Sequence, residues 1–389
     1  MANSINRRNW IKSSAFMAGG LAFFSGTISK LAAMPVAKKL APLAKRFTDQ
    51  DAILNAPPVL KARLLANENP FGPSPAAKKA IQEAIDLGYQ YPMQSTGILY
   101  DKIAQYEGLS SSNILLESGS SPLLLAAALL YSKGGKSIIT GDPSYDDLPS
   151  HAEKFDGKWV KVPLTAEYKL DLDAMEAKID DNTGLVYICN PNNPTATVLD
   201  TEKLKAFCER VSKKVTVFVD EAYIDYLPDP KAATMINAVR AGHNVIVART
   251  FSKLYGFAGL RCGYVIAQPE TIKALSIYTT GFSLSATTIA GVIAGYREEA
   301  FLKEALQKTL ASKEYLYSVL KKEGYEYIPS SANFVMFPLK MDSKKFVSEM
   351  MKRGVGVRSW QFNGKEWCRV SIGRMDEMEA FADAFKQLS

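Results

Sequence analysis

The sequence contains few of the residues that bind metals or act in histidine-dependent catalysis. Its 389 residues include only two histidines, His151 and His243, which stand apart from each other and from any cluster of possible ligands. The four cysteines form no C-x-x-C pair, the spacing typical of zinc and redox sites. We therefore predict no metal site and no histidine-based catalytic triad.

The cysteines are also too scattered to predict a disulfide framework. Most of them lie within apolar runs, where a free cysteine behaves as a small core residue. We expect buried thiols at Cys189, Cys208, Cys262 and Cys368.

Acidic residues are absent from the beginning of the chain. The first 46 residues carry eight lysines and arginines and no aspartate or glutamate. These eight charges exceed the net charge of +7, so the rest of the chain is close to neutral. Because a nucleic-acid-binding domain needs a basic face, we expect no nucleic-acid partner.

The basic N-terminus resembles a twin-arginine export signal. Arg7 and Arg8 precede an apolar stretch from Ala15 to Gly26, which is shorter than the span of about 20 apolar residues that crosses a bilayer. We predict a signal peptide and linker over residues 1–40, export to the periplasm and no stable membrane anchor. An uncleaved anchor and a cytoplasmic protein with an accidental arginine pair are the alternatives.

Short apolar runs alternate with helical patterns through the middle of the chain. This alternation predicts an α/β fold whose central sheet is mostly parallel and flanked by helices. The predicted strands lie at 113–117, 137–140, 184–189, 215–220, 244–248 and 263–267, and a predicted helix covers 122–131.

The pattern changes near Phe301 to a long charged helix, three apolar runs and a last helix. It predicts a second, smaller α+β domain over 298–389, after a large domain over 93–297. We expect the proline-rich segment 41–92 to pack on the small domain.

Polar motifs follow three consecutive predicted strands. NPNNPT follows the run at 184–189, DEAY begins at Asp220, the last residue of the run at 215–220, and RTFSK follows the run at 244–248. In open α/β sheets, ligands bind outside the carboxyl ends of the strands. The three motifs therefore predict one site.

The side chains in these motifs suit a pyridine cofactor. Asp220 ends an apolar strand, where a carboxylate needs a cationic partner. Tyr223 offers a phenol and Asn193 an amide. Lys253 is most simply a solvated charge, but an amine that is desolvated or next to another cation becomes a nucleophile near neutral pH.

Other residues suit a phosphate group. Ser252 and Arg261 are phosphate-binding types. Ser120 or Ser121 caps the predicted helix at 122–131, whose first N–H groups would face an anion; these serines are alternatively only a helix cap. Pyridoxal 5'-phosphate requires this combination of phosphate site, amine, carboxylate and ring-oxygen donors.

The motifs NPNNPT, DEAY and RTFSKLYGFAGLRCGY, in this order, resemble the fold-type I aminotransferases of class I and II. ANENPFGPSP and YQYP are similar to the histidinol-phosphate aminotransferase branch, and the resemblance extends from Leu65 to Gly373. It implies a fold-type I pyridoxal phosphate transferase that works as a homodimer with shared active sites.

The resemblance also implies a role for each matching residue. Lys253 would bind the cofactor covalently and move the proton at the substrate Cα. Asp220 would pair with the ring nitrogen, while Asn193 and Tyr223 would donate hydrogen bonds to the ring oxygen. Tyr145 would stack on the ring, although a tyrosine at that place is also often merely half-buried.

The remaining implied contacts are with phosphate and substrate. Ser120, Ser121, Ser252 and Arg261 would bind the phosphate, together with Tyr91 of a second subunit. Arg369 would bind the α-carboxylate bidentately. Asn69 would also contact the substrate, and Arg358 would meet a distal anionic group or else be a surface arginine.

Three departures from the branch pattern concern the substrate more than the cofactor. The segment NAPPVLKARLL lacks the tyrosine and glycine with which the branch encloses a substrate phosphate. Ser121 and Pro122 replace an acidic pair, and Ala196 replaces a glycine. The first departure argues against histidinol phosphate as the substrate.

We therefore expect an aminotransferase that moves an amino group between an L-amino acid, or a histidinol-phosphate-like amine, and a 2-oxo acid. One alternative is a decarboxylase on the same scaffold, since it would share the cofactor residues. A protein that binds cofactor and amino acid without turnover is the second.

Overall fold

The computed structural model describes residues 60–388. The predicted export signal over residues 1–40 lies outside the described residues. No helix in the described part is both long and apolar enough to cross a membrane. The strands are β1 (Ala62–Arg63), β2 (Ile114–Glu117), β3 (Ser137–Asp142), β4 (Lys158–Pro163), β5 (Thr183–Cys189), β6 (Thr216–Asp220), β7 (Val245–Thr250), β8 (Gly263–Ile266), β9 (Phe334–Pro338), β10 (Val355–Gly356), β11 (Arg358–Phe362) and β12 (Lys365–Ser371).

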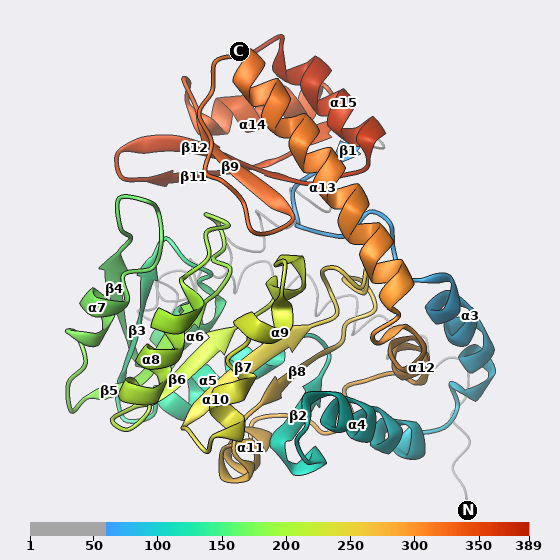
Figure 1. The fold of residues 1–389 in the computed structure, drawn as a ribbon, viewed down its shortest axis with the longest axis vertical. Coiled ribbons are helices and arrows are strands. Elements are labelled where there is room, and N and C mark those ends of the chain that lie inside the picture. The colour runs from blue at the N-terminus through green and yellow to red at the C-terminus, as the bar shows by residue number, and fades with distance from the viewer. Residues whose placement is uncertain (1–59, 389) are drawn as a thin grey trace, which may run out of the picture. The chain divides into compact units, whose positions relative to one another are not determined.

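Helices connect these strands and cover the sheets (Figure 1). They are α3 (Pro75–Ala84), α4 (Met93–Glu107), α5 (Ser121–Tyr131), α6 (Asp147–Lys154), α7 (Leu172–Glu176), α8 (Thr201–Val211), α9 (Pro230–Ala233), α10 (Ile236–Arg240), α11 (Pro269–Ser276), α12 (Ala286–Gly295), α13 (Glu299–Lys322), α14 (Ser343–Lys352) and α15 (Met375–Phe385).

The largest sheet has seven strands in the order β2-β8-β7-β6-β5-β3-β4. All neighbours pair in parallel except β8, which is antiparallel to both β2 and β7. The mostly parallel α/β fold predicted from the sequence is confirmed. The sequence interpretation missed β4, because Lys158 and Lys161 interrupt its apolar pattern at the edge of the sheet.

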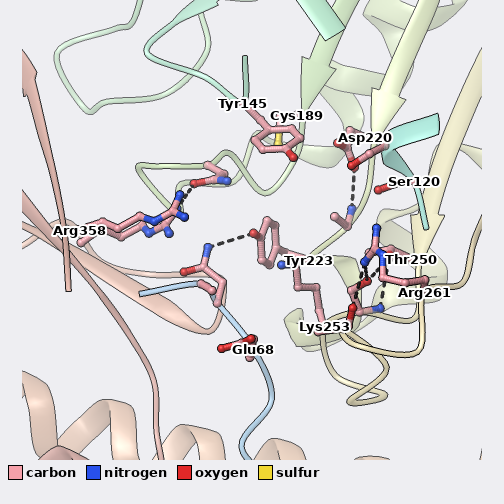
Figure 2. A pocket seen from close by; sticks show the side chains of 18 residues that line it. Glu68, Ser120, Tyr145, Cys189, Asp220, Tyr223, Thr250, Lys253, Arg261 and Arg358 are labelled. Atoms are coloured by element: carbon pink, nitrogen blue, oxygen red, sulfur yellow. Dashed lines mark hydrogen bonds between the residues drawn. The ribbon is translucent and has the colours of Figure 1, made fainter. Parts of the chain in front are cut away.

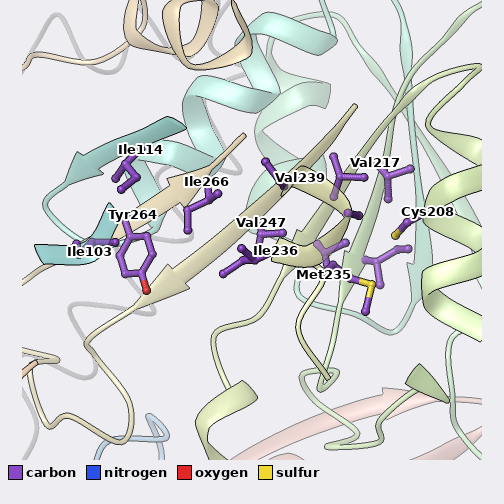
Figure 3. Close-up of a cluster of buried hydrophobic side chains, with 14 of the residues drawn as sticks. Ile103, Ile114, Cys208, Val217, Met235, Ile236, Val239, Val247, Tyr264 and Ile266 are labelled. Atoms are coloured by element: carbon purple, nitrogen blue, oxygen red, sulfur yellow. The ribbon is translucent and has the colours of Figure 1, made fainter. Parts of the chain in front are cut away.

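Side chains alternate between two buried clusters on the two faces of this sheet. In β5, Val186 and Ile188 belong to the cluster shown in Figure 3, which also includes Ile103 from α4 and Cys208 from α8. Tyr187 of the same strand belongs to the opposite cluster, with side chains of α5, α6 and α11. Both faces of β5 are therefore buried, which explains its continuous apolar run.

A separate antiparallel sheet, β11-β12-β9, packs with α13, α14 and α15 around its own core. Leu316, Phe346 and Phe381, one from each helix, are buried in that core. Strand β1 pairs in parallel with β10, so the beginning of the described chain packs with the C-terminal strands and helices. The domain boundaries predicted from the sequence stay a prediction.

All four cysteines are buried free thiols, as expected. No group of three or more histidine, cysteine or acidic side chains within residues 60–388 could hold a metal ion.

Candidate active site

A cavity of about 280 Å³ opens at the carboxyl ends of β5, β6 and β7, where the three sequence motifs meet (Figure 2). The N-terminal segment, the start of α5 and the strands β11 and β12 complete its wall. The lining residues predicted from the sequence are Ser120, Ser121, Tyr145, Asn193, Asp220, Tyr223, Ser252, Lys253, Arg261, Arg358 and Arg369.

Lys253 lies in the loop after β7, largely buried, with its Nζ 5.3 Å from the centroid of the Tyr223 ring. Burial disfavours the ammonium form, and the positive charge of Arg369 adds to this effect, so the pKa of Lys253 is lowered to about 8. An amine with this pKa is available as a nucleophile near neutral pH.

Asp220 ends β6 and is almost completely buried. Its Oδ2 accepts a hydrogen bond from the Tyr187 hydroxyl at 3.0 Å, and its Oδ1 accepts one from the Ala222 N–H at 3.1 Å. Burial raises the pKa of Asp220 to about 6, although these hydrogen bonds oppose the rise.

The cationic partner expected for Asp220 is not an ion-paired side chain. No lysine or arginine within residues 60–388 forms an ion pair with this carboxylate, although the more distant charge of Lys253 lowers its pKa. A protonated ring nitrogen of a bound cofactor would provide the missing positive charge.

Arg369, on β12, is buried, and only some of its N–H groups have hydrogen-bond partners. Its Nη1 donates to Asn193 Oδ1 at 2.7 Å and its Nη2 to the Leu65 carbonyl at 3.0 Å, whereas its Nε has no partner. The guanidinium lies over the rings of Trp360 and Phe334. Burial lowers the pKa of Arg369 to about 10. A carboxylate in the cavity would neutralise the charge of Arg369 and accept a hydrogen bond from its Nε.

The predicted phosphate-binding residues meet at one end of the cavity. Arg261 Nη1 donates to Ser252 Oγ at 3.2 Å, and the Thr250 hydroxyl donates to the same oxygen at 3.0 Å. Ser120 precedes α5, whose first turn contains Pro122. Ser120 is the N-cap residue, as predicted from the sequence, but its hydroxyl makes no capping hydrogen bond and lines the cavity.

Gly119 allows Arg261 to reach this position. Its φ is +93°, and a Cβ at this residue would collide with Arg261 Nη2. A larger residue would therefore displace the guanidinium from the cavity.

Two predicted site residues lie outside the cavity. Tyr91 is 80% exposed, so a contact with phosphate would need a second subunit. Asn69 donates to the Leu254 carbonyl at 2.6 Å and accepts from the Phe71 N–H at 3.0 Å. Because the amide nitrogen and the amide oxygen of Asn69 both form hydrogen bonds with the backbone, we infer that Asn69 supports the Lys253 loop. Its contact with substrate stays a prediction.

The sequence interpretation missed several cavity residues. Asn67 and Glu68 lie in the ANENP motif and line the wall, where Glu68 is paired with Arg63. Thr250 and Cys189 also line the cavity. The Tyr187 hydroxyl, which does not line it, donates a hydrogen bond to Asp220. Asn67 could have been found in the sequence because it lies in the ANENP motif. No pattern in the sequence links Tyr187 to Asp220.

These residues fit pyridoxal phosphate. An amine of lowered pKa, a buried carboxylate without a cation, a buried arginine with a free N–H and a serine-arginine anion site all face one cavity. The fold and the site together define a pyridoxal phosphate-dependent enzyme of fold type I.

Comparisons with known proteins identify the family. The family model "Aminotransferase class I and II" matches residues 61–385, and the chain belongs to this family of pyridoxal phosphate-dependent aminotransferases. The chain is 36% identical over 328 residues to a histidinol-phosphate aminotransferase of Moorella thermoacetica, covering 84% of this chain and 85% of that protein. It is also 36% identical over 319 residues to an aromatic amino acid aminotransferase of Mycolicibacterium vanbaalenii, covering 82% of this chain and 90% of the relative.

A solved structure shares both fold and cofactor. The histidinol-phosphate aminotransferase of Sinorhizobium meliloti in complex with pyridoxal 5'-phosphate matches with a TM-score of 0.79 and 28% identity, over 85% of this chain and 92% of that chain. The predicted cofactor and enzyme class are thereby confirmed, as is the resemblance to histidinol-phosphate aminotransferases.

Proposed function

We propose that this aminotransferase uses Lys253 to bind the cofactor covalently and to transfer the proton at the substrate Cα. The observation that carries the proposal is the meeting of Lys253, Asp220 and Arg369 in one cavity. When bound, the cofactor withdraws electrons from the Cα–H bond, which makes that proton acidic.

The other residues position the reactants. Asp220 would keep the ring nitrogen protonated, Asn193 and Tyr223 would donate hydrogen bonds to the ring oxygen, and Tyr145 would stack on the ring. Ser120, Ser121, Ser252 and Arg261 bind the phosphate. Arg369 binds the substrate α-carboxylate and so holds the Cα proton near Lys253 Nζ.

Reductive trapping tests the role of Lys253. Borohydride reduction of the purified holoenzyme should fix the cofactor to the peptide that contains Lys253, as detected by mass spectrometry. Lys253→Ala should bind the cofactor reversibly and yield no such peptide. A reducible linkage in Lys253→Ala would overturn the assignment.

We also infer that the substrate pair includes a molecule with a second anionic group, which Arg358 would bind. Arg358 lines the cavity, and its guanidinium has no ion pair or hydrogen bond within residues 60–388. Relatives are named for histidinol phosphate and for aromatic amino acids. Since the chain lacks the tyrosine and glycine that enclose a substrate phosphate in the branch, we favour an aromatic amino donor and a dicarboxylic 2-oxo acid acceptor.

A screen of amino donors against 2-oxo acid acceptors tests this substrate proposal. Transamination yields a new amino acid and a new 2-oxo acid in equal amounts. Release of carbon dioxide from the donor would instead identify a decarboxylase, and binding without turnover would identify a binding protein.

A homodimer would complete the site. Large apolar side chains near Tyr91 are exposed, including Leu87, Met93 and Phe282, and such a surface favours burial against a second subunit. Mixing inactive Lys253→Ala with inactive Tyr91→Ala should restore part of the activity if Tyr91 acts across the interface. Full activity of Tyr91→Ala alone would exclude this role.

The proposal of export rests on Arg7 and Arg8 and the apolar stretch after them. Cell fractionation should recover the mature protein from the periplasm, and Arg7→Lys combined with Arg8→Lys should retain it in the cytoplasm. Cytoplasmic location of the unaltered protein would contradict the proposal.

A further inference from the structure

Asn67 connects the N-terminal segment with the catalytic tyrosine. It is 1% exposed and has a φ of +54°, a conformation that asparagine and aspartate adopt more readily than other side chains. Its Nδ2 donates to the Tyr223 hydroxyl oxygen at 3.0 Å (Figure 2). The Asn333 side chain fixes the same segment by donating to the Asn67 and Glu68 carbonyls.

Ser371 on β12 completes a chain of hydrogen bonds through Asn67. The Asn67 backbone N–H donates to Ser371 Oγ at 2.8 Å, and the Ser371 hydroxyl donates to Asn67 Oδ1 at 2.8 Å. Because Ser371 is buried, its hydroxyl hydrogen needs this acceptor. The opposite orientation of the Asn67 amide would leave that hydrogen without one.

The chain of bonds therefore has a fixed direction. It starts at a backbone N–H, which can only donate, passes through Ser371 and the Asn67 amide, and ends on the lone pair of Tyr223. The Tyr223 hydroxyl hydrogen has no acceptor within residues 60–388, while Tyr223 itself lines the cavity. The hydrogen is thus free to point into the cavity.

We propose that Asn67 is a positioning residue that makes the Tyr223 hydroxyl a hydrogen-bond donor to the cofactor's ring oxygen. The inference rests on the role proposed above for Tyr223 and goes beyond it by assigning what sets the direction of its proton. A hydrogen bond donated to an ionised oxygen stabilises the ionised form. Tyr223 in this orientation lowers the pKa of the bound cofactor's chromophore.

Asn67→Asp reverses the direction of the hydrogen bond between residue 67 and Tyr223, and the side chain keeps nearly the same size and shape. Aspartate tolerates the same backbone conformation, but its carboxylate accepts the Tyr223 hydrogen and withdraws it from the cavity. We expect the chromophore pKa, followed by spectrophotometric pH titration of the holoenzyme, to rise by about 1, as for one hydrogen bond. Cofactor affinity of the apoenzyme, measured by equilibrium dialysis with pyridoxal phosphate, should fall about tenfold.

The added negative charge would also raise the chromophore pKa, and a double-mutant cycle separates the two effects. In a Tyr223→Phe background, Asn67→Asp should have little further effect if it acts through the hydroxyl. A shift of the same size in both backgrounds would overturn the inference.

The cycle also distinguishes failure of the inference from failure of the role of Tyr223. If Tyr223→Phe alone leaves the chromophore pKa unchanged, then Tyr223 does not contact the ring oxygen and both claims are wrong. If Tyr223→Phe raises the pKa while Asn67→Asp has no effect, only the role of Asn67 is wrong.

Discussion

Arg358 and Arg369 are direct register partners on the antiparallel strands β11 and β12, and both line the cavity. Like charges opposite each other on a sheet are unfavourable. The Arg369 guanidinium has hydrogen bonds to Asn193 and Leu65, whereas the Arg358 guanidinium has none within residues 60–388. An anionic ligand between the two guanidinium groups would offset their repulsion, which supports the proposal that one molecule of the substrate pair carries a second anionic group.

We predict that Arg358→Ala changes substrate preference and not the chemical step. The catalytic efficiency for a substrate with a distal carboxylate should fall about 10- to 100-fold, as expected for loss of a charged hydrogen bond. An amino acid with an apolar side chain should be affected much less. Steady-state kinetics with both substrates measure the difference.

Arg353→Ala serves as the control, since Arg353 is paired with Glu349 on α14 and does not line the cavity. Equal losses for both substrates in Arg358→Ala would contradict the proposed role.

The pKa of Lys253 makes the stability of the apoenzyme depend on pH. The folded protein releases the proton at about pH 8, whereas an ordinary lysine releases it at 10.5. The unfolded chain therefore binds more protons between these values, and stability rises with pH across this window. The destabilisation is fully present below pH 8 and is lost toward pH 10.5.

Lys253→Met should accordingly make the apoenzyme more stable at pH 7, by up to about 3 kcal/mol. This gain should shrink at about pH 9.5. Urea denaturation of both apoproteins at the two pH values measures it, and a gain that does not depend on pH would show that Lys253 is not desolvated.

Asp220 and Tyr187 allow charge and hydrogen bonding to be tested separately. Asp220→Asn removes the negative charge opposite the ring nitrogen and should reduce kcat by about 100-fold or more. Tyr187→Phe removes one of the two hydrogen bonds to the carboxylate but leaves its charge, so it should cost less, about tenfold. Single-turnover rates of the two variants give the comparison, and similar losses in both would argue against a role for the charge.

The need for glycine at position 119 can be tested with a larger residue. Gly119→Ala would place a methyl group against Arg261 Nη2, so we expect pyridoxal phosphate affinity to fall by about tenfold or more. Gly134 also has a positive φ, +77°, but nothing lies within 4 Å of its added Cβ. Gly134→Ala should cost about 1 kcal/mol of stability and leave the dialysis-measured affinity unchanged; equal affinities in the two variants would refute the prediction.

The polar motifs at the strand ends could be predicted to form one site because the topology of a parallel sheet places those ends side by side. Lys253, Asp220, Tyr223 and Asn193 each closely follow or end a buried strand, so their positions depend on local sequence. Arg369 is distant in sequence and was assigned by resemblance alone.

Residues whose role depends on a distant partner could not be predicted in this way. Asn69 and Asn67 lie in the same motif, yet Asn69 supports the Lys253 loop and Asn67 bonds Tyr223. The order of residues does not specify which amide faces the cavity, because that depends on backbone dihedrals and on partners such as Ser371, which is 304 residues away.

Most strands of the large sheet, the family and the candidate cofactor residues could be predicted from the sequence, because each lies in a short local segment. Contacts between distant segments, which the sequence does not reveal, leave three groups of the described chain unsatisfied: the Asp220 carboxylate without an ion pair, the free Nε of Arg369 and the free hydrogen of Tyr223. These unsatisfied groups arise from burial and from contacts between distant segments, and a bound cofactor and substrate would satisfy them.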